Sequence, residues 1–132
     1  MSDTLIQQEK LRLVIGENHP DLAESLAILI DFQPDLTCVG TGRSNAEVTR
    51  LAQELRADVY VLDLSLDDGS SIPIMRMLRS DQPDAAIIAY TGHSNPVLTD
   101  ECHKAGCDAV ITKAGDVDEL LATIRTAARK YR

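Results

Sequence analysis

Five polar residues stand directly after apolar stretches of the chain and together could accept a phosphoryl group. They are Glu17, Asn18, Asp63, Thr91 and Lys113. A carboxylate such as Asp63 can attack phosphorus and form an acyl phosphate. The charge on the phosphoryl group is then best balanced by a divalent cation and a fixed positive side chain. These residue types therefore indicate phosphoryl transfer, provided that the fold brings them to one place.

The elements that would position them alternate between strand and helix five times. Apolar runs of strand length cover residues 11–15, 36–40, 59–62, 85–90 and 109–112. The run 59–62 is apolar throughout, which is typical of a strand buried on both faces of a parallel sheet. The segment 65–71 is polar and is expected to be a loop. This alternation predicts an α/β fold, with a parallel sheet covered by helices on both faces.

Segments of helical periodicity follow the apolar runs. Pro20 suits the first turn of the first helix, and Ser44 or Asn45 can cap the second. The last helix should begin near Asp116. Its expected inward side chains are Val117, Leu120, Leu121, Ile124 and Ala128.

The chemistry-bearing residues fall at or just beyond the carboxyl ends of the first, third, fourth and fifth predicted strands. In open α/β sheets, ligand sites form along that edge. Residues far apart in the sequence are therefore expected to share one pocket.

Composition narrows the possible functions. The 21 acidic and 13 basic residues give a formal charge of −8, which argues against direct binding to nucleic acid or an anionic membrane. Cys38, Cys102 and Cys107 form no CxxC pair, and an odd count suits reduced thiols in the cytoplasm. The chain's 132 residues fit one domain, predicted to cover 11–132 after a polar segment at 1–10. No apolar run approaches the ~20 residues of a membrane span.

Four short motifs follow one another along the chain: Glu-Asn-His-Pro at 17–20, Val-Leu-Asp-Leu around Asp63, Tyr-Thr-Gly at 90–92 and Ala-Gly-Cys-Asp-Ala-Val-Ile-Thr-Lys ending at Lys113. In order and spacing, these motifs resemble those of the receiver domains of two-component response regulators. The resemblance runs from about residue 11 to residue 129. It implies a flavodoxin-like (βα)5 fold with strand order 2-1-3-4-5. It also implies a phospho-accepting signalling domain rather than a conventional enzyme.

The resemblance further implies a role for each residue. Asp63 would accept a phosphoryl group from a histidine kinase or phosphotransfer protein. Mg²⁺ would be held by Asp63, the side-chain oxygen of Asn18 and the backbone carbonyl of Ser65, with Glu17 acting through a bound water. Lys113 would pair with phosphoryl oxygens, and Thr91 would offer its hydroxyl. Partners could include a second copy, bound through the face made by the fourth helix, fifth strand and fifth helix.

Two departures from the family pattern keep an alternative open. Asn18 stands where the family usually has Asp, which removes one negative charge from the metal site. Val110 stands where many receivers carry Tyr or Phe, whose inward swing accompanies activation. These features suit a degenerate receiver that docks or dimerises without phosphorylation. A flavodoxin-like cofactor protein or an aspartyl phosphatase is a weaker alternative, because the chain lacks aromatic residues to flank a flavin.

Several other polar residues favour ordinary structural roles. Asp67 and Asp68 are typical turn formers ahead of Gly69. His93 fits an exposed loop, and the Cys102-His103 pair lacks the further ligands of a zinc site.

Overall fold

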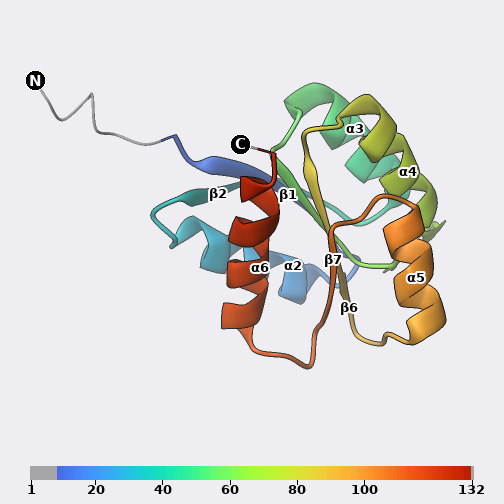
Figure 1. The fold of residues 1–132 in the computed structure, drawn as a ribbon. Coiled ribbons are helices and arrows are strands. Elements are labelled where there is room, and N and C mark those ends of the chain that lie inside the picture. Colours follow the sequence, from blue (N-terminus) through green and yellow to red (C-terminus); the bar gives the residue numbers. More distant parts are fainter. Residues whose placement is uncertain (1–8, 132) are drawn as a thin grey trace, which may run out of the picture.

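The computed structural model describes residues 9–131 and contains a five-stranded parallel sheet at its centre (Figure 1). The strands are β1 (Leu11–Gly16), β2 (Leu36–Gly42), β3 (Val59–Leu62), β6 (Ala86–Thr91) and β7 (Ala109–Thr112). Their order across the sheet is β2-β1-β3-β6-β7, which confirms the flavodoxin-like arrangement predicted from the sequence. Most of the predicted polar segment 1–10 lies outside the described residues, and only Glu9 and Lys10 are seen, both exposed.

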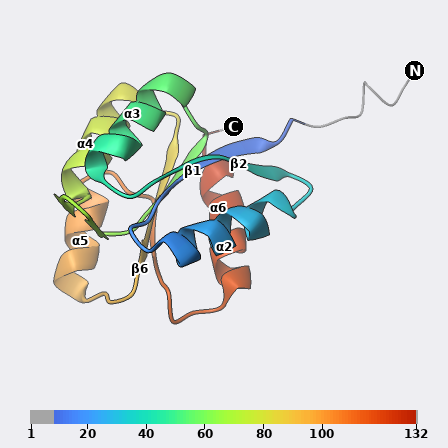
Figure 2. The same cartoon turned by 180° about the vertical axis from the view of Figure 1, so that it is seen from behind.

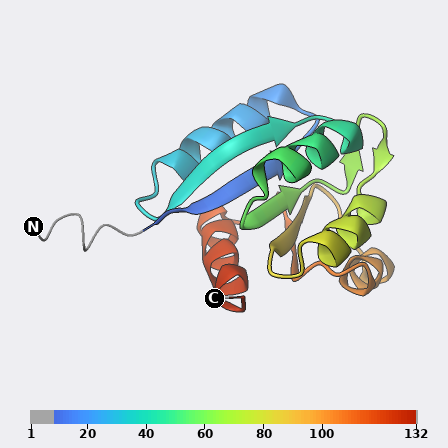
Figure 3. The same cartoon turned by 90° about the horizontal axis from the view of Figure 1, so that it is seen from above.

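Helices cover both faces of the sheet. They are α2 (Pro20–Asp31), α3 (Asn45–Leu55), α4 (Ile72–Asp81), α5 (Pro96–Lys104) and α6 (Val117–Arg129). Helices α2 and α6 lie on one face, and α3, α4 and α5 lie on the other (Figures 2 and 3). Within residues 9–131, no helix combines the length and the apolar character that a membrane crossing requires.

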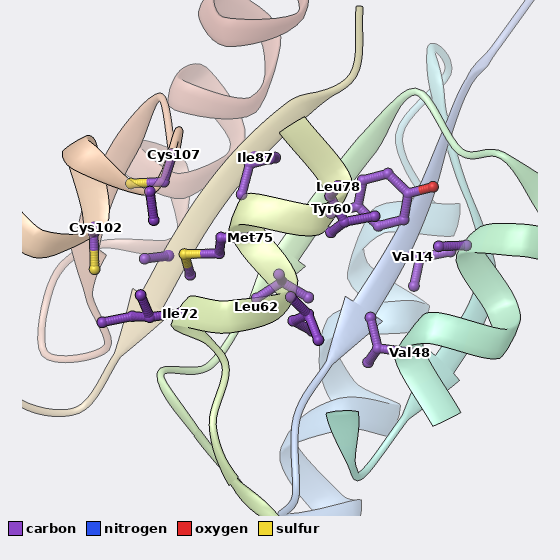
Figure 4. Close-up of a cluster of buried hydrophobic side chains, with 14 of the residues drawn as sticks. Val14, Val48, Tyr60, Leu62, Ile72, Met75, Leu78, Ile87, Cys102 and Cys107 are labelled. Atoms are coloured by element: carbon purple, nitrogen blue, oxygen red, sulfur yellow. The ribbon is translucent and has the colours of Figure 1, made fainter. Parts of the chain in front are cut away.

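Two hydrophobic layers hold the helices to the sheet. Strands β3 and β6 are buried along their whole length, because each side of the sheet packs against helices. Tyr60, Leu62, Met75 and Ile87 belong to the layer beneath α3, α4 and α5 (Figure 4). Residues that alternate with them, such as Val61 and Ile88, belong to the layer beneath α2 and α6. Aliphatic side chains thus form a rigid frame for the loops at the carboxyl edge.

Two details differ from the sequence-based expectations. The segment expected to be a polar loop contains a short antiparallel hairpin, β4 (Ser65–Leu66) and β5 (Gly69–Ser70). Its turn uses Gly69 with φ +120°, a conformation that favours glycine. Val117 was expected to point inward, but it is 39% exposed because it is the first residue of α6 and lies beyond the covered part of the sheet.

The hairpin is fastened to the start of α3. The carboxylate of Asp68 accepts hydrogen bonds from the backbone N–H groups of Asn45 (2.6 Å) and Ala46 (3.2 Å), which are free donors of that helix. The Asn45 amide in turn donates to the carbonyls of Gly69 and Ser70. Asp68 is therefore a helix cap from a distant loop, and it fixes the segment that follows Asp63.

Candidate functional site

The carboxyl ends of β1, β3 and β7 bring three charged side chains into direct contact. The Lys113 ammonium donates to Glu17 Oε1 at 2.6 Å and to Asp63 Oδ2 at 2.7 Å. The backbone continues the sheet up to these residues, since Asp63 N–H donates to the Gly16 carbonyl and Lys113 N–H donates to the Thr91 carbonyl. The predicted convergence of Glu17, Asp63 and Lys113 is thus present in the fold.

In this cluster, burial and hydrogen bonding shift the pKa values of Glu17 and Lys113 in opposite directions, and hydrogen bonding has the larger total effect. The side chains of Glu17, Asp63 and Lys113 are 1%, 10% and 18% exposed. Burial raises the pKa of Glu17, but hydrogen bonds from Lys113 and His19 outweigh it and hold that pKa below its usual value. Burial lowers the pKa of Lys113, but its bonds to Asp63 and Glu17 raise it above the ordinary range. One ammonium pairs with two carboxylates, so the cluster keeps a net negative charge that a further cation can neutralise.

His19 shares the second oxygen of Glu17. Its backbone N–H donates to Glu17 Oε2 at 3.0 Å, and its ring Nδ1 lies 2.9 Å from the same oxygen. The ring is 73% exposed, so His19 lies on the solvent side of the cluster rather than in its interior. The Glu17 carboxylate is therefore fixed from two directions, by Lys113 and by His19.

Asn18 shows the feature expected of a cation ligand. Within residues 9–131, its buried side-chain oxygen has no hydrogen-bond partner. Such an orphaned oxygen is uncommon in folded proteins, because a buried acceptor without a donor is unfavourable. Potential ligand atoms of Glu17, His19 and Asp63 also lie within 4.8 Å of one another. The donor set, mostly oxygen and net negative, fits a hard divalent cation such as Mg²⁺.

The loop after Asp63 is held by hydrogen bonds close to that residue. The Ser71 hydroxyl, fully buried at the start of α4, donates to the Asp63 carbonyl at 2.6 Å. The Ser65 N–H donates to Asp63 Oδ1 at 3.2 Å. One carboxylate oxygen of Asp63 is thus held closely by Lys113, and the other accepts the longer bond from Ser65.

Thr91 lies at the end of β6 and is 6% exposed. Its hydroxyl donates to the His93 carbonyl at 2.9 Å and accepts from the His93 N–H at 3.3 Å. The hydroxyl is therefore engaged with its own loop rather than with Asp63. A shift of this loop would release it.

Other polar residues noted in the sequence have structural partners. Asp67 pairs with Arg43 at 3.4 Å, both side chains being about half exposed, and His93 is an exposed loop residue. All three cysteines are free thiols. Burial raises the pKa of Cys107 to about 12, which makes it an inert core residue.

Comparison with known proteins decides the family. The model of the response regulator receiver domain matches residues 13–125. The chain belongs to the response regulator receiver domain family. Among curated relatives, it is 27% identical over 123 residues to the nitrate/nitrite response regulator NarL of Escherichia coli K12. It is 25% identical over 119 residues to the transcriptional regulatory protein LiaR of Bacillus subtilis 168.

These relatives are longer than this receiver domain. The matches cover 92% and 90% of the present chain but 56% of both NarL and LiaR. A solved LuxR-family two-component response regulator from Aurantimonas sp. SI85-9A1 superposes with a TM-score of 0.87 at 27% identity. That superposition covers 94% of this chain and 89% of the other. The response regulator domain of Thermotoga maritima CheB, at 23% identity and TM-score 0.83, supports the fold alone.

Sequence reasoning about this receiver domain missed two contacts. The spacing of the charged residues did not indicate that His19 binds Glu17, although a residue two positions after a strand-end acid, at a helix start, is well placed to do so. Ser71 was taken only as the end of a loop. A serine just before Ile72-Pro73 is a recognisable helix-start signal, but its bond to the Asp63 carbonyl depends on the hairpin.

Proposed function

We propose that this receiver domain accepts a phosphoryl group on Asp63 from a histidine kinase or phosphotransfer protein, in a reaction that depends on Mg²⁺. The observation that carries the proposal is the contact of Lys113 with both Glu17 and Asp63 at the end of three separate strands. An ammonium held there offsets the charge that develops on the transferred group.

Asp63, Lys113 and Thr91 each have a separate role in the proposed transfer. The Asp63 carboxylate attacks phosphorus, forming an oxygen–phosphorus bond while the phosphohistidine nitrogen–phosphorus bond breaks and its electron pair returns to the imidazole. Lys113 orients Asp63 beforehand and stays beside the phosphoryl oxygens. Thr91 gives up its bond to the His93 carbonyl and donates its hydroxyl to the new acyl phosphate. The loop carrying Thr91 and His93 is then the part of the domain that responds.

Three groups would hold the cation: the Asp63 carboxylate, the orphaned Asn18 oxygen and the Ser65 backbone carbonyl, with Glu17 acting through a water molecule. Bound Mg²⁺ would neutralise negative charge on the phosphoryl group. Asn18 supplies a neutral oxygen in place of a carboxylate, so the affinity for Mg²⁺ should be modest.

Acetyl phosphate with Mg²⁺ provides the test. Intact mass spectrometry, followed by borohydride trapping and peptide mapping, should place a phosphoryl group on Asp63. Asp63→Asn should prevent it, while Asp67→Asn, a matched change at an exposed acid of the hairpin, should leave it intact. Equal modification of wild type and Asp63→Asn would overturn the assignment.

We propose that phosphorylation of Asp63 changes the face formed by α5, β7 and α6. Strand β7 is at the edge of the sheet, and a groove of about 420 Å³ lies between its start and α6, lined by residues such as Ala109, Ala122 and Thr126. We propose this face as the contact surface for a second copy. Light scattering with and without beryllofluoride should show whether the mass doubles, and a mass that stays monomeric would count against the dimer.

The names of the relatives suggest the wider setting. NarL and LiaR are regulatory proteins, and we propose that this domain likewise serves a cytoplasmic transcription-regulating pathway. Direct nucleic-acid binding is not assigned to this strongly acidic domain.

A second candidate is a docking module that acts without phosphorylation. It is favoured by Asn18 and by Val110, which packs half-buried against the core instead of providing a mobile aromatic ring. Unmeasurable Mg²⁺ affinity, together with partner binding that Asp63→Ala leaves unchanged, would select this candidate over the first.

A further inference from the structure

Tyr90 lies directly beside the cluster of Glu17, Asp63 and Lys113. The steps proposed for phosphoryl transfer do not involve this tyrosine. Strands β3 and β6 run parallel with Leu62 opposite Ala89, so Asp63, just after β3, and Tyr90, the penultimate residue of β6, lie side by side. The tyrosine is 6% exposed and packs in the layer beneath α2 and α6, together with Val61. The ring thus forms the wall of the site on that side of the sheet.

The ring also lies close to the Lys113 ammonium. The Lys113 Nζ is 6.0 Å from the ring centroid, at the outer limit of a cation–π interaction. Burial raises the pKa of the Tyr90 phenol, while Lys113 lowers it and Glu17 raises it. Two of the three charged groups of the cluster, Lys113 and Glu17, therefore act electrostatically on the phenol.

A long lysine side chain needs such a support. Lys113 follows the edge strand β7 and extends towards two carboxylates that directly follow β1 and β3. Many rotamers of its flexible stem would instead place the ammonium in solvent. A flat aromatic surface beside the carboxylates restricts these rotamers and keeps the ammonium near Asp63.

We propose that Tyr90 is a positioning residue that holds the Lys113 ammonium over Asp63 through the face of its ring. The ring, rather than the hydroxyl, performs this role. The value of this placement for phosphoryl transfer rests on the proposed function, but the placement itself exists in the resting protein and can be measured without a phosphoryl donor.

The experiment is trace acetylation of the full chain with acetic anhydride, quantified by peptide mass spectrometry. The labelling rate of Lys113 is divided by that of Lys104, whose side chain is 74% exposed and serves as an internal reference. Loss of the ring face frees the stem of Lys113, so that its amine leaves the carboxylates more often and reacts with the anhydride. Tyr90→Leu should therefore raise the ratio roughly two- to fivefold, and Tyr90→Phe should leave it unchanged.

Two further variants distinguish an effect of the ring on the position of Lys113 from a general effect of core packing. Tyr60→Leu removes a buried tyrosine from the opposite layer, so it should lower stability without changing the labelling ratio. A fluorinated phenylalanine at position 90 keeps the shape of the ring but withdraws its electron density. It should raise the ratio towards the Tyr90→Leu value, and it provides the decisive comparison if Tyr90→Leu does not fold.

Two results would overturn the proposal. One is an unchanged ratio with the fluorinated ring. The other is a rise in Tyr90→Phe as large as in Tyr90→Leu, which would assign the effect to the hydroxyl. Either result leaves phosphorylation of Asp63 standing. Conversely, a wild-type chain that acetyl phosphate never modifies would remove the proposed function without altering these labelling ratios.

Discussion

Replacing Lys113 by methionine should strongly destabilise the domain in the absence of divalent cations. The change removes the ammonium shared by Glu17 and Asp63 and keeps a side chain of similar length. Two largely buried carboxylates then face each other with no ammonium between them. Their repulsion and desolvation, rather than the loss of a favourable contact alone, cause the effect.

The expected magnitude follows from the burial of the three groups. Removing one partner of a buried ion pair costs about 3–5 kcal/mol. For a chain of 132 residues this corresponds to a fall in Tm of roughly 10–18 °C. Such a loss is a large part of the ~5–15 kcal/mol by which domains are stable.

The assay is urea denaturation at pH 7 in EDTA, repeated with Mg²⁺. The cation should restore part of the stability of Lys113→Met, because it can take over the role of the ammonium. Lys104→Met is the matched control: its i,i+4 pair with Asp100 is exposed and should contribute less than ~0.5 kcal/mol. Adding Glu17→Gln and Asp63→Asn to Lys113→Met should recover most of the loss.

Comparable free energies of unfolding for Lys113→Met and Lys104→Met would refute this reasoning. The ammonium would then contribute no more than a surface charge, and the three groups could not form the compact cluster described above.

Three further perturbations test other parts of the description. Asn18→Asp should strengthen Mg²⁺ binding roughly tenfold, because a charged ligand replaces a neutral one; unchanged affinity by titration calorimetry would exclude Asn18 from the site. Gly106→Ala should cost about 1–3 kcal/mol, because Gly106 has φ +108° and a Cβ there would lie 2.8 Å from Arg79; an unchanged urea midpoint would contradict that geometry. The hydrogen bonds of Arg125 hold the pKa of Asp35 below its ordinary 3.8, so Asp35 stabilises the fold above that pH and the benefit is lost as pH falls through the lower folded value. Asp35→Asn should therefore be less stable than wild type at pH 7 and nearly equal to it at the acid end, and equal stabilities at pH 7 would count against the pair.

The strands and helices of the domain could be predicted because the sequence patterns that indicate them are local and repeated. A short all-apolar run with valine and tyrosine, such as 59–62, favours a buried strand. Five runs of strand length separated by helical periodicity then leave few topologies. The convergence of Glu17, Asp63 and Lys113 then follows from parallel strands ending at one edge. No long-range information beyond strand direction was needed.

What the sequence could not indicate depends on tertiary contacts. The hairpin after Asp63 forms because Asp68 caps a helix that begins more than twenty residues earlier. The hydroxyl of Thr91 points to the His93 carbonyl, a choice set by loop geometry rather than by residue type. The exposure of Val117 likewise reflects where the sheet ends, which helical periodicity does not report.

The most direct test of the account is ¹⁹F and ¹H–¹⁵N NMR of the protein with Mg²⁺ and beryllofluoride, a stable mimic of an aspartyl phosphate. A bound fluoride signal should appear in wild type and be absent in Asp63→Asn, and the amide shifts should centre on residues 63, 91 and 113. A bound signal that persists in Asp63→Asn, or no bound signal in wild type at saturating Mg²⁺, would contradict the claim that Asp63 accepts the phosphoryl group.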